Sequence, residues 1–250
     1  MTVELLQFRF SNAAEKVRWA LEYKGIAHRR RDLLPGLHRA KVKRLTKQTA
    51  TPVLLLDDAR ICGSAEITAA LERRFPESKP LYPTDPTLRA QALDLERHFD
   101  RLLGPAVRIA ILGAVLDDAR YAAELLASGS PPTTRAFYRA LLPFLRGPMR
   151  SASGIHHPHA TRLAAHQLEQ SAVSLARLAK RSFYLCGDGF SVADLTAAAL
   201  LAPLVAPHPQ MRPPEPMPDA LAALVEKWRS APVGAWVLEM YRRHRPVNPS

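Results

Sequence analysis

The stretch of residues 50–67 constrains the fold of this chain most, because it joins a proline-led apolar run, a turn and a helix start. Pro52 precedes the apolar residues 53–56. Proline has no N–H to donate to a sheet, so it belongs at the first position of a strand. The Asp57-Asp58 pair that follows favours a turn. Residues 59–62 are therefore expected to return beside residues 53–56 as the second strand of a hairpin.

Both ends of this hairpin are suited to hold a ligand. At its start, the Thr51–Pro52 peptide bond is a candidate cis bond, an arrangement that leaves the backbone groups of Thr51 free to pair with an extended ligand. Beyond its end, Ser64 begins a helix whose apolar face opens with Ile67. A serine in this place caps the helix, and the free N–H groups of the first turn can also receive a carboxylate.

The composition indicates a folded, cationic protein. With 250 residues, of which 47% are hydrophobic, the chain can bury a core for one large or two small domains. Lys and Arg outnumber Asp and Glu by 35 to 23, so an anionic partner is plausible. The basic helix expected over residues 37–45 has no interleaved aromatic residues, which favours a solvated face over a specific nucleic-acid site.

Cysteine usage and hydropathy predict a cytoplasmic location. Cys62 and Cys186 stand far apart without a CxxC or metal-ligand spacing, and the first residues show no signal peptide. A reducing compartment is therefore expected. No apolar run approaches the roughly 18 residues that a membrane span needs, so no spanning segment is expected.

The order of elements predicts two domains. Up to Pro76 the pattern is strand, helix, strand, helix, strand, strand and helix, which indicates an α/β unit with a mixed sheet. The following stretch, ESKPLYPTDP, contains three prolines and is typical of a linker, and beyond it the pattern is helical throughout. We expect an α/β domain at 1–77, a linker at 78–87 and an all-helical domain at 88–250.

Three features are expected within the helical half. Residues 191–194 (SVAD) have the form of a capping box, and the helix that they begin is apolar nearly all round and should be buried. A kink is expected at Gly104-Pro105 and an interruption at Pro143, because a proline removes one hydrogen bond from a helix.

Ser11 stands before the first helix and has two alternative roles. It can be the N-cap of that helix, which would need no further explanation. Alternatively, Asn12 caps the helix together with Glu15, and the Ser11 hydroxyl is then free to donate to a thiolate or another anion at the positive end of the helix.

Several site chemistries lack support in the sequence. Four histidines lie close together in the chain, but no cysteine or acidic residue stands at a spacing that is typical of zinc ligands, so we expect no metal site there. The glycine and serine motifs of hydrolases, nucleoside triphosphatases and dinucleotide-binding proteins are also missing. The four histidines are His156, His157, His159 and His166.

Taken together, these features resemble the glutathione S-transferase superfamily over nearly the whole chain. Residues 11–18 (SNAAEKVR) are similar to the S-P-x-x-x-K-V-R active-site turn of that family, and residues 19–26 (WALEYKGI) to what commonly follows it. Pro52 at a strand start, Ser64 on a helix and a helical half that contains SVAD complete the likeness. The resemblance implies a thioredoxin-like first domain with Thr51–Pro52 cis, an all-helical second domain and a homodimer.

The resemblance also implies a site for glutathione as co-substrate. Thr51, held by Pro52, would pair with the cysteinyl backbone, Ser64 would meet the γ-glutamyl carboxylate, and Ser11 would donate to the sulfur. A free thiol has a pKa near 8.5, and a hydroxyl donor at a helix N-terminus lowers that value. The resulting thiolate would attack a small electrophile that lies against the helical domain.

The sequence departs from the family pattern at several of these positions. Asn12 replaces the usual proline, and Ala14 replaces the cysteine of redox-active members, so thiol–disulfide exchange is not expected. Gly63 stands where a Glu or Gln normally helps to hold the ligand; losing such a charge-assisted hydrogen bond costs about 1.5–3 kcal/mol. Glu66 is close in sequence but is expected to point elsewhere.

Two functions therefore remain open. The first is a glutathione transferase that conjugates the glutathione thiolate to a small electrophile, and the second is a non-catalytic binding protein of the same fold with a weakened or absent glutathione site. Ser11 favours the first and Gly63 the second. Candidate contacts of the glycyl carboxylate are Lys47, Gln48 and Arg44, and candidate contacts of the electrophile are Arg97, His98, Arg101, Arg108 and Tyr121.

Overall fold

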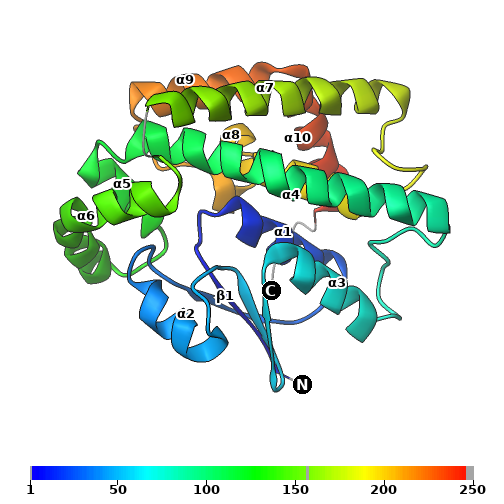
Figure 1. The fold of residues 1–250 in the computed structure, drawn as a ribbon, viewed down its shortest axis with the longest axis horizontal. Coiled ribbons are helices and arrows are strands. Elements are labelled where there is room, and N and C mark those ends of the chain that lie inside the picture. The colour runs from blue at the N-terminus through cyan, green and yellow to red at the C-terminus, as the bar shows by residue number, and fades with distance from the viewer. Residues whose placement is uncertain (1, 156–157, 246–250) are drawn as a thin grey trace.

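The computed structural model describes residues 2–155 and 158–245, which form a sheet-containing half and a helical half (Figure 1). The sheet has four strands in the order β2-β1-β3-β4, and β1 pairs parallel with β2 and antiparallel with β3. The predicted mixed four-stranded sheet is therefore confirmed. Its strands are β1 (Val3–Gln7), β2 (Arg29–Asp32), β3 (Val53–Leu56) and β4 (Ala59–Cys62).

Helices cover both faces of this sheet, since successive strand residues point to opposite sides. Leu5 belongs to the core shared with α1 (Asn12–Tyr23) and α3 (Ser64–Arg74). Leu6, its neighbour in the chain, packs instead with Val42 of α2 (His38–Thr46) on the other face. The predicted hairpin is also present: β3 and β4 pair with Val53 opposite Cys62, and the two aspartates form the turn.

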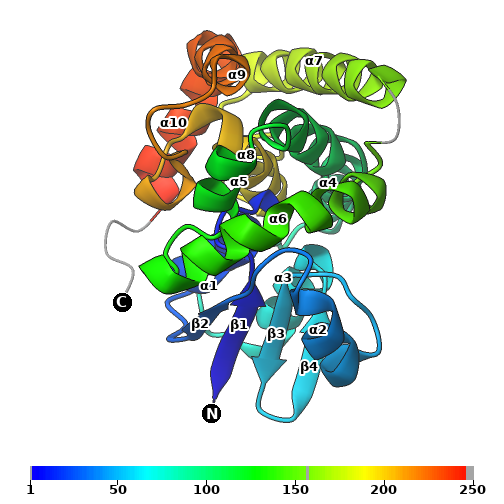
Figure 2. The same ribbon diagram turned by 90° about the vertical axis from the view of Figure 1, so that its left-hand side faces the viewer.

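The second half of the chain is all-helical, as predicted, and lies over the α1 and α3 side of the sheet (Figures 1 and 2). The expected interruption at Pro143 is wrong, because α6 continues through it. Helix α4 continues through Pro105, and the kink expected there stays a prediction. A proline removes only one hydrogen bond, and packing on the core offsets that loss. The helices are α4 (Pro86–Val115), α5 (Ala119–Leu126), α6 (Pro132–Ala152), α7 (Pro158–Arg181), α8 (Val192–Val205), α9 (Asp219–Ser230) and α10 (Pro232–His244), with a 3-10 turn at Pro209–Met211.

Helix α8 forms the centre of the helical half, and every one of its residues is buried. The predicted capping box begins it: the Asp194 carboxylate accepts the Ser191 N–H at 3.0 Å and the Leu185 N–H at 2.8 Å. The Val192 N–H donates to the Leu81 carbonyl at 2.7 Å, which ties the start of α8 to the connection between the halves.

A buried ion pair joins the two halves. The ammonium group of Lys16 on α1 lies 2.8 Å from the Glu96 carboxylate and 2.6 Å from that of Asp100, both on α4. The Thr68 hydroxyl of α3 donates to the same Glu96 at 3.1 Å. These contacts hold α1, including its first turn, in a defined position against α4.

None of the described helices is long and apolar enough to cross a membrane.

Candidate functional site

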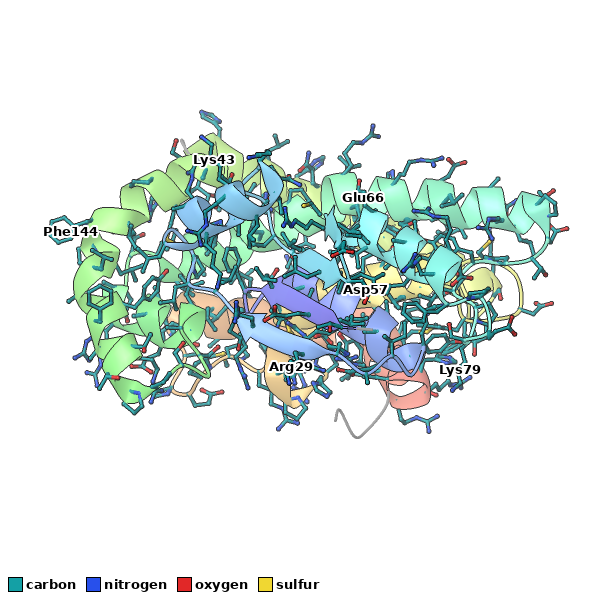
Figure 3. The ribbon with its side chains drawn as sticks, turned by 90° about the horizontal axis from the view of Figure 1, so that it is seen from below. Arg29, Lys43, Asp57, Glu66, Lys79 and Phe144 are labelled. Atoms are coloured by element: carbon teal, nitrogen blue, oxygen red, sulfur yellow. The ribbon has the colours of Figure 1, made fainter. Side chains whose placement is uncertain are left out.

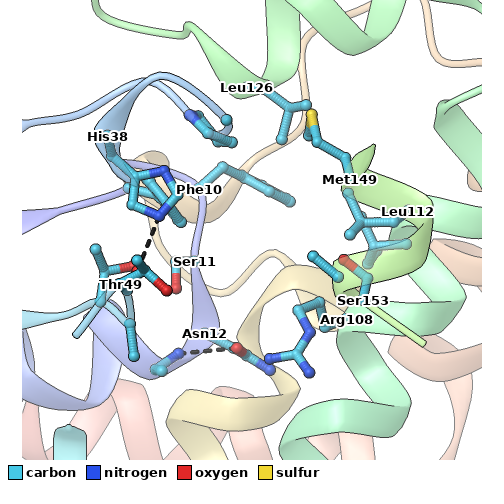
Figure 4. Close-up of a pocket in the computed structure, with 18 of the residues that line it drawn as sticks. Phe10, Ser11, Asn12, His38, Thr49, Arg108, Leu112, Leu126, Met149 and Ser153 are labelled. Carbon is cyan, nitrogen blue, oxygen red and sulfur yellow. Dashed lines mark hydrogen bonds between the residues drawn. The ribbon is translucent and has the colours of Figure 1, made fainter. Parts of the chain in front are cut away.

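A cavity of about 580 Å³ lies between the two halves, at the start of α1 (Figure 4). One wall comes from the sheet half: the loop after β1 with Ser11, the first turn of α2, and residues 49–51 before β3. The other wall comes from α4 and α6 and is mostly apolar, with Val107 and Met149 among its members. The cavity thus combines backbone and hydroxyl groups on one side with hydrocarbon on the other.

Ser11 lines this cavity and is the N-cap of α1. Its side-chain oxygen accepts the Ala14 N–H at 3.3 Å, so the cap is Ser11 and the alternative cap by Asn12 and Glu15 is wrong. Accepting that bond uses a lone pair and leaves the hydroxyl proton available. Ser11 can therefore cap the helix and still donate to a ligand in the cavity.

Asn12 has a tertiary role in place of the expected cap. Its side-chain amide donates to the Gly104 carbonyl of α4 at 3.1 Å and to the Leu200 carbonyl of α8 at 3.4 Å. Asn12 is buried as the first residue of α1 and ties that helix to both helices of the other half. Glu15 points into a separate buried cluster, where its carboxylate lies 2.8 Å from Arg18.

Thr51 lies in the cavity wall with Thr49 and Ala50, and the Thr51–Pro52 peptide bond is cis. Within the described part of the chain, neither the N–H nor the carbonyl of Thr51 makes a hydrogen bond. By contrast, the neighbouring Pro52 carbonyl accepts the Gly63 N–H at 3.1 Å. The backbone of Thr51 therefore offers an unused donor and acceptor beside Ser11.

The start of α3 lies outside the residues that line the cavity. Gly63 is the N-cap, and its φ of 91° is a conformation that favours glycine. A β-carbon at Gly63 would meet the carboxylate of Glu66, so this side chain folds back over the helix start. The expectation that Glu66 points elsewhere is thus wrong. A carboxylate is favourable there because the first turn carries the positive end of the helix dipole.

The residues of α2 and of the segment that follows it divide into two groups. Lys47 and Gln48 are exposed and do not line the cavity, and Figure 3 shows Lys43 likewise pointing away from the protein. His38 and Arg39, at the start of the helix, do line it. Sequence analysis missed these two, because the basic segment carries cations on every side and nothing local indicates which side faces the other half.

His38 supports the cavity wall as a neutral side chain. Its Nε2 atom lies 3.0 Å from the Thr49 carbonyl, and its ring packs edge-on against Phe8 at 4.7 Å between ring centres. Burial lowers the pKa of His38 below its ordinary value. The neutral ring therefore donates to Thr49 and holds the segment that leads to Thr51.

Of the five candidate contacts of an electrophile, only Arg108 of α4 lines the cavity. The side chain of Arg97 pairs with Asp94 on the exposed side of the helix, and the Tyr121 hydroxyl donates to the Pro214 carbonyl at 2.8 Å. His98 packs against the ring of Phe99, and Arg101 is exposed. The helical periodicity of the sequence could not single out Arg108 among these residues. Which side of α4 faces the cavity depends on how the helix crosses the sheet half.

Within the described ranges, no three histidine, cysteine or acidic residues are grouped so that they could hold a metal ion. His159 lies with its Nδ1 atom 2.9 Å from Arg162, and His166 lies 3.4 Å from the Gln170 amide, both on the exposed face of α7. His156 and His157 lie outside the described residues.

Comparison with protein families gives one match, to the N-terminal domain of glutathione S-transferases over residues 5–79. That segment runs from within β1 to beyond α3 and includes Ser11, Thr51 and Ser64. A comparison with curated proteins gives no match.

Solved structures of this fold match the whole chain. The beta-etherase LigF from Sphingobium sp. strain SYK-6 is 20% identical, with a TM-score of 0.62 over 97% of this chain and 100% of that one. FzlA from C. crescentus is 22% identical, with a TM-score of 0.60 over 99% of this chain and 96% of that one. A glutathione S-transferase from Methylobacterium radiotolerans JCM 2831, in complex with glutathione sulfonate, is 20% identical, with a TM-score of 0.58 over 100% and 97%.

Proposed function

The chain carries a glutathione S-transferase N-terminal domain over residues 5–79 and has the two-domain fold of that superfamily, and on this premise we propose that it is a glutathione transferase. It conjugates the glutathione thiolate to a small electrophile held between the two halves. The observation that carries this proposal is the cavity itself, which places Ser11 and the unpaired backbone of Thr51 opposite an apolar wall.

Ser11 stabilises the thiolate in this mechanism. A free thiol with a pKa near 8.5 is only about 3% ionised at pH 7. The Ser11 hydroxyl, whose oxygen already accepts the Ala14 N–H, donates a hydrogen bond to the sulfur and lowers that pKa, so that the thiol releases its proton to the solvent. The thiolate then forms a bond to the electrophilic carbon, and the leaving group departs with the electron pair.

The rest of glutathione is assigned to groups around Ser11. The cysteinyl backbone pairs with the N–H and carbonyl of Thr51, next to Pro52. The glycyl carboxylate binds Arg39, in preference to Lys47 and Gln48, because only Arg39 lines the cavity.

The γ-glutamyl carboxylate is assigned to Ser64 and the first-turn N–H groups of α3, the general kind of site at which helices bind anions. There it competes with the carboxylate of Glu66, which covers the neighbouring Gly63. Of all the assigned contacts, this one is expected to be the weakest.

One observation favours a second function, a binding protein of this fold without conjugating activity. Gly63 supplies no side chain, and the Glu66 carboxylate occupies the place that the γ-glutamyl carboxylate needs. Like charges at one helix start repel, so the affinity for glutathione falls. If that affinity is too low, the cavity serves another ligand.

The two functions are separated by measuring thermal stability in millimolar glutathione together with conjugation of a chlorodinitrobenzene. Glutathione at about 100 times its dissociation constant stabilises a protein by about 2.7 kcal/mol. Ser11→Ala is expected to lower kcat/KM by about 10- to 100-fold, as for a hydrogen bond to a charged group. Ser11→Thr, which keeps both cap and hydroxyl, is the matched control. Stabilisation by glutathione without turnover would indicate the binding protein. If glutathione gives neither stabilisation nor turnover, the transferase function is excluded.

A further inference from the structure

Arg108 is a cation without a counterion among the residues that the structure describes. It projects from α4 into the cavity, and Figure 4 shows its guanidinium group on the side of Asn12. Within the described part of the chain it makes no salt bridge and no side-chain hydrogen bond, whereas Arg97 on the same helix pairs with Asp94. None of the described residues that line the cavity is acidic.

The surroundings of Arg108 make this lack of a partner costly. Its side chain is open to the solvent of the cavity, yet the protein atoms around it desolvate the guanidinium and lower its pKa. A partly desolvated charge is stabilised when an opposite charge arrives, and the planar guanidinium binds a carboxylate through two parallel hydrogen bonds. An anion that enters the cavity would therefore meet a guanidinium whose hydrogen-bond donors are unused within the described part of the chain.

The helical wall of the cavity, from which Arg108 projects, is mostly apolar. Val107 and Ile111 adjoin it on α4, and Leu126 and Met149 line the same cavity from α5 and α6. A ligand that fits this wall has a hydrocarbon or aromatic body that carries one anionic group. Glutathione itself is polar along its whole length and does not match this pattern.

We propose that Arg108 binds a carboxylate on the second substrate, so that the preferred electrophiles are apolar or aryl compounds that carry a carboxylate. This inference rests on the proposed transferase function and adds the substrate class to it. Arg39 and Arg108 then have separate roles, since Arg39 lies on the sheet side of the cavity and Arg108 on the helical side.

The test compares a chlorodinitrobenzoate with its methyl ester, which share the reacting carbon and differ in the charge of one substituent. In both, the thiolate sulfur bonds to the carbon that bears chlorine, and chloride leaves with the electron pair. The parent should prefer the acid, and Arg108→Gln should lower kcat/KM for the acid by about 10- to 100-fold while the ester changes by less than about twofold. Arg108→Lys should be intermediate, because it keeps the charge and loses the fork geometry.

Arg101→Gln, an exposed arginine on the same helix, is the matched control and should leave both substrates unchanged. An equal loss on acid and ester in Arg108→Gln would overturn the proposal. A higher KM for glutathione in that variant would also overturn it, because Arg108 would then be a glutathione contact.

If the parent converts neither compound, the transferase function fails and the inference on Arg108 is tested by binding alone. The probe is then the chlorine-free dinitrobenzoate, measured by calorimetry on the parent and Arg108→Gln, with equal folding of both checked by thermal unfolding. Binding at least tenfold tighter to the parent supports the carboxylate site, and equal binding rejects it.

Discussion

The start and the middle of α1 border two groups of charged side chains that differ in how they are neutralised. In the middle of the helix, the fully buried Glu15 lies 2.8 Å from Arg18 and 3.3 Å from Arg245, and it accepts the Tyr241 hydroxyl at 3.0 Å. At its start, the cavity contains Arg108 without any acidic residue in its lining.

This contrast distinguishes charged side chains that are paired within the protein from those that are available to bind a ligand. Burial by itself would raise the pKa of Glu15, but the guanidinium groups of Arg245 and Arg18 outweigh it and hold the pKa below its ordinary value. Glu15 is therefore ionised, and its contacts with Tyr241 of α10 and with Arg245 hold the end of this helix against α1. In the cavity, none of the described lining residues is an acid that could compensate Arg108, so this charge is available to an incoming anion.

The largest expected effect comes from breaking the closed cluster. Glu15→Gln leaves the buried Arg18 and Arg245 without one of their counterions, and removing one partner of a buried pair costs about 3–5 kcal/mol. Unfolding in urea measures this loss. Glu239→Gln, which removes an exposed carboxylate that pairs with Arg242 on α10, is the control and should leave the midpoint unchanged. A small effect of Glu15→Gln would mean that the cluster does not hold the halves together.

A smaller effect is expected at the start of α3, where the chain supplies its own carboxylate. Glu66→Gln removes the negative charge beside Gly63 and should raise the affinity for glutathione by about two- to fivefold, the range of a charge at a helix terminus. Calorimetry measures it, with Glu77→Gln beyond the other end of the helix as the control. Unchanged affinity would show that the γ-glutamyl group binds elsewhere.

The smallest effect concerns His38, which has no carboxylate partner and stays neutral. Burial lowers the pKa of His38, so below about pH 6.5 the unfolded chain takes up a proton at this residue before the folded chain does. Stability is thus lost as the pH falls. The stability advantage of the parent over His38→Asn should therefore shrink between pH 7 and pH 5 in urea unfolding. A constant difference would contradict a neutral His38.

Much of the fold could be predicted from local patterns. The alternation of strands and helices predicted the mixed sheet, Pro52 and the two aspartates predicted the hairpin, and the SVAD sequence predicted the cap of α8. The hairpin and the cap rest on interactions within a few residues of chain, and the identity of each strand and helix follows from its local pattern. The pairing of β1 with β3 joins residues that are far apart in the chain, and it follows from the order of the elements. The proline at position 143 misled the prediction, because the loss of one hydrogen bond does not by itself end a long helix.

The site was predictable only in part. Ser11 and Thr51, which the sequence singled out because they flank elements whose order was clear, line one cavity, and their roles toward a ligand stay predictions. His38 and Arg39 were missed, because a helix that is basic on all sides gives no indication of its inner face. Arg108 could not be distinguished from its neighbours on α4 by period or composition.

By itself, the sequence determined the elements, their order and the chemistry available at the start of α1. The tertiary structure decided how those groups are used. Ser11 caps α1 although Asn12 is an equally good cap by local rules, because the carbonyls of Gly104 and Leu200 engage the Asn12 amide. Gly104 and Leu200 lie far from Asn12 in the chain. Contacts between the two halves likewise decide which charged side chains are paired within the protein and which remain available to a ligand in the cavity.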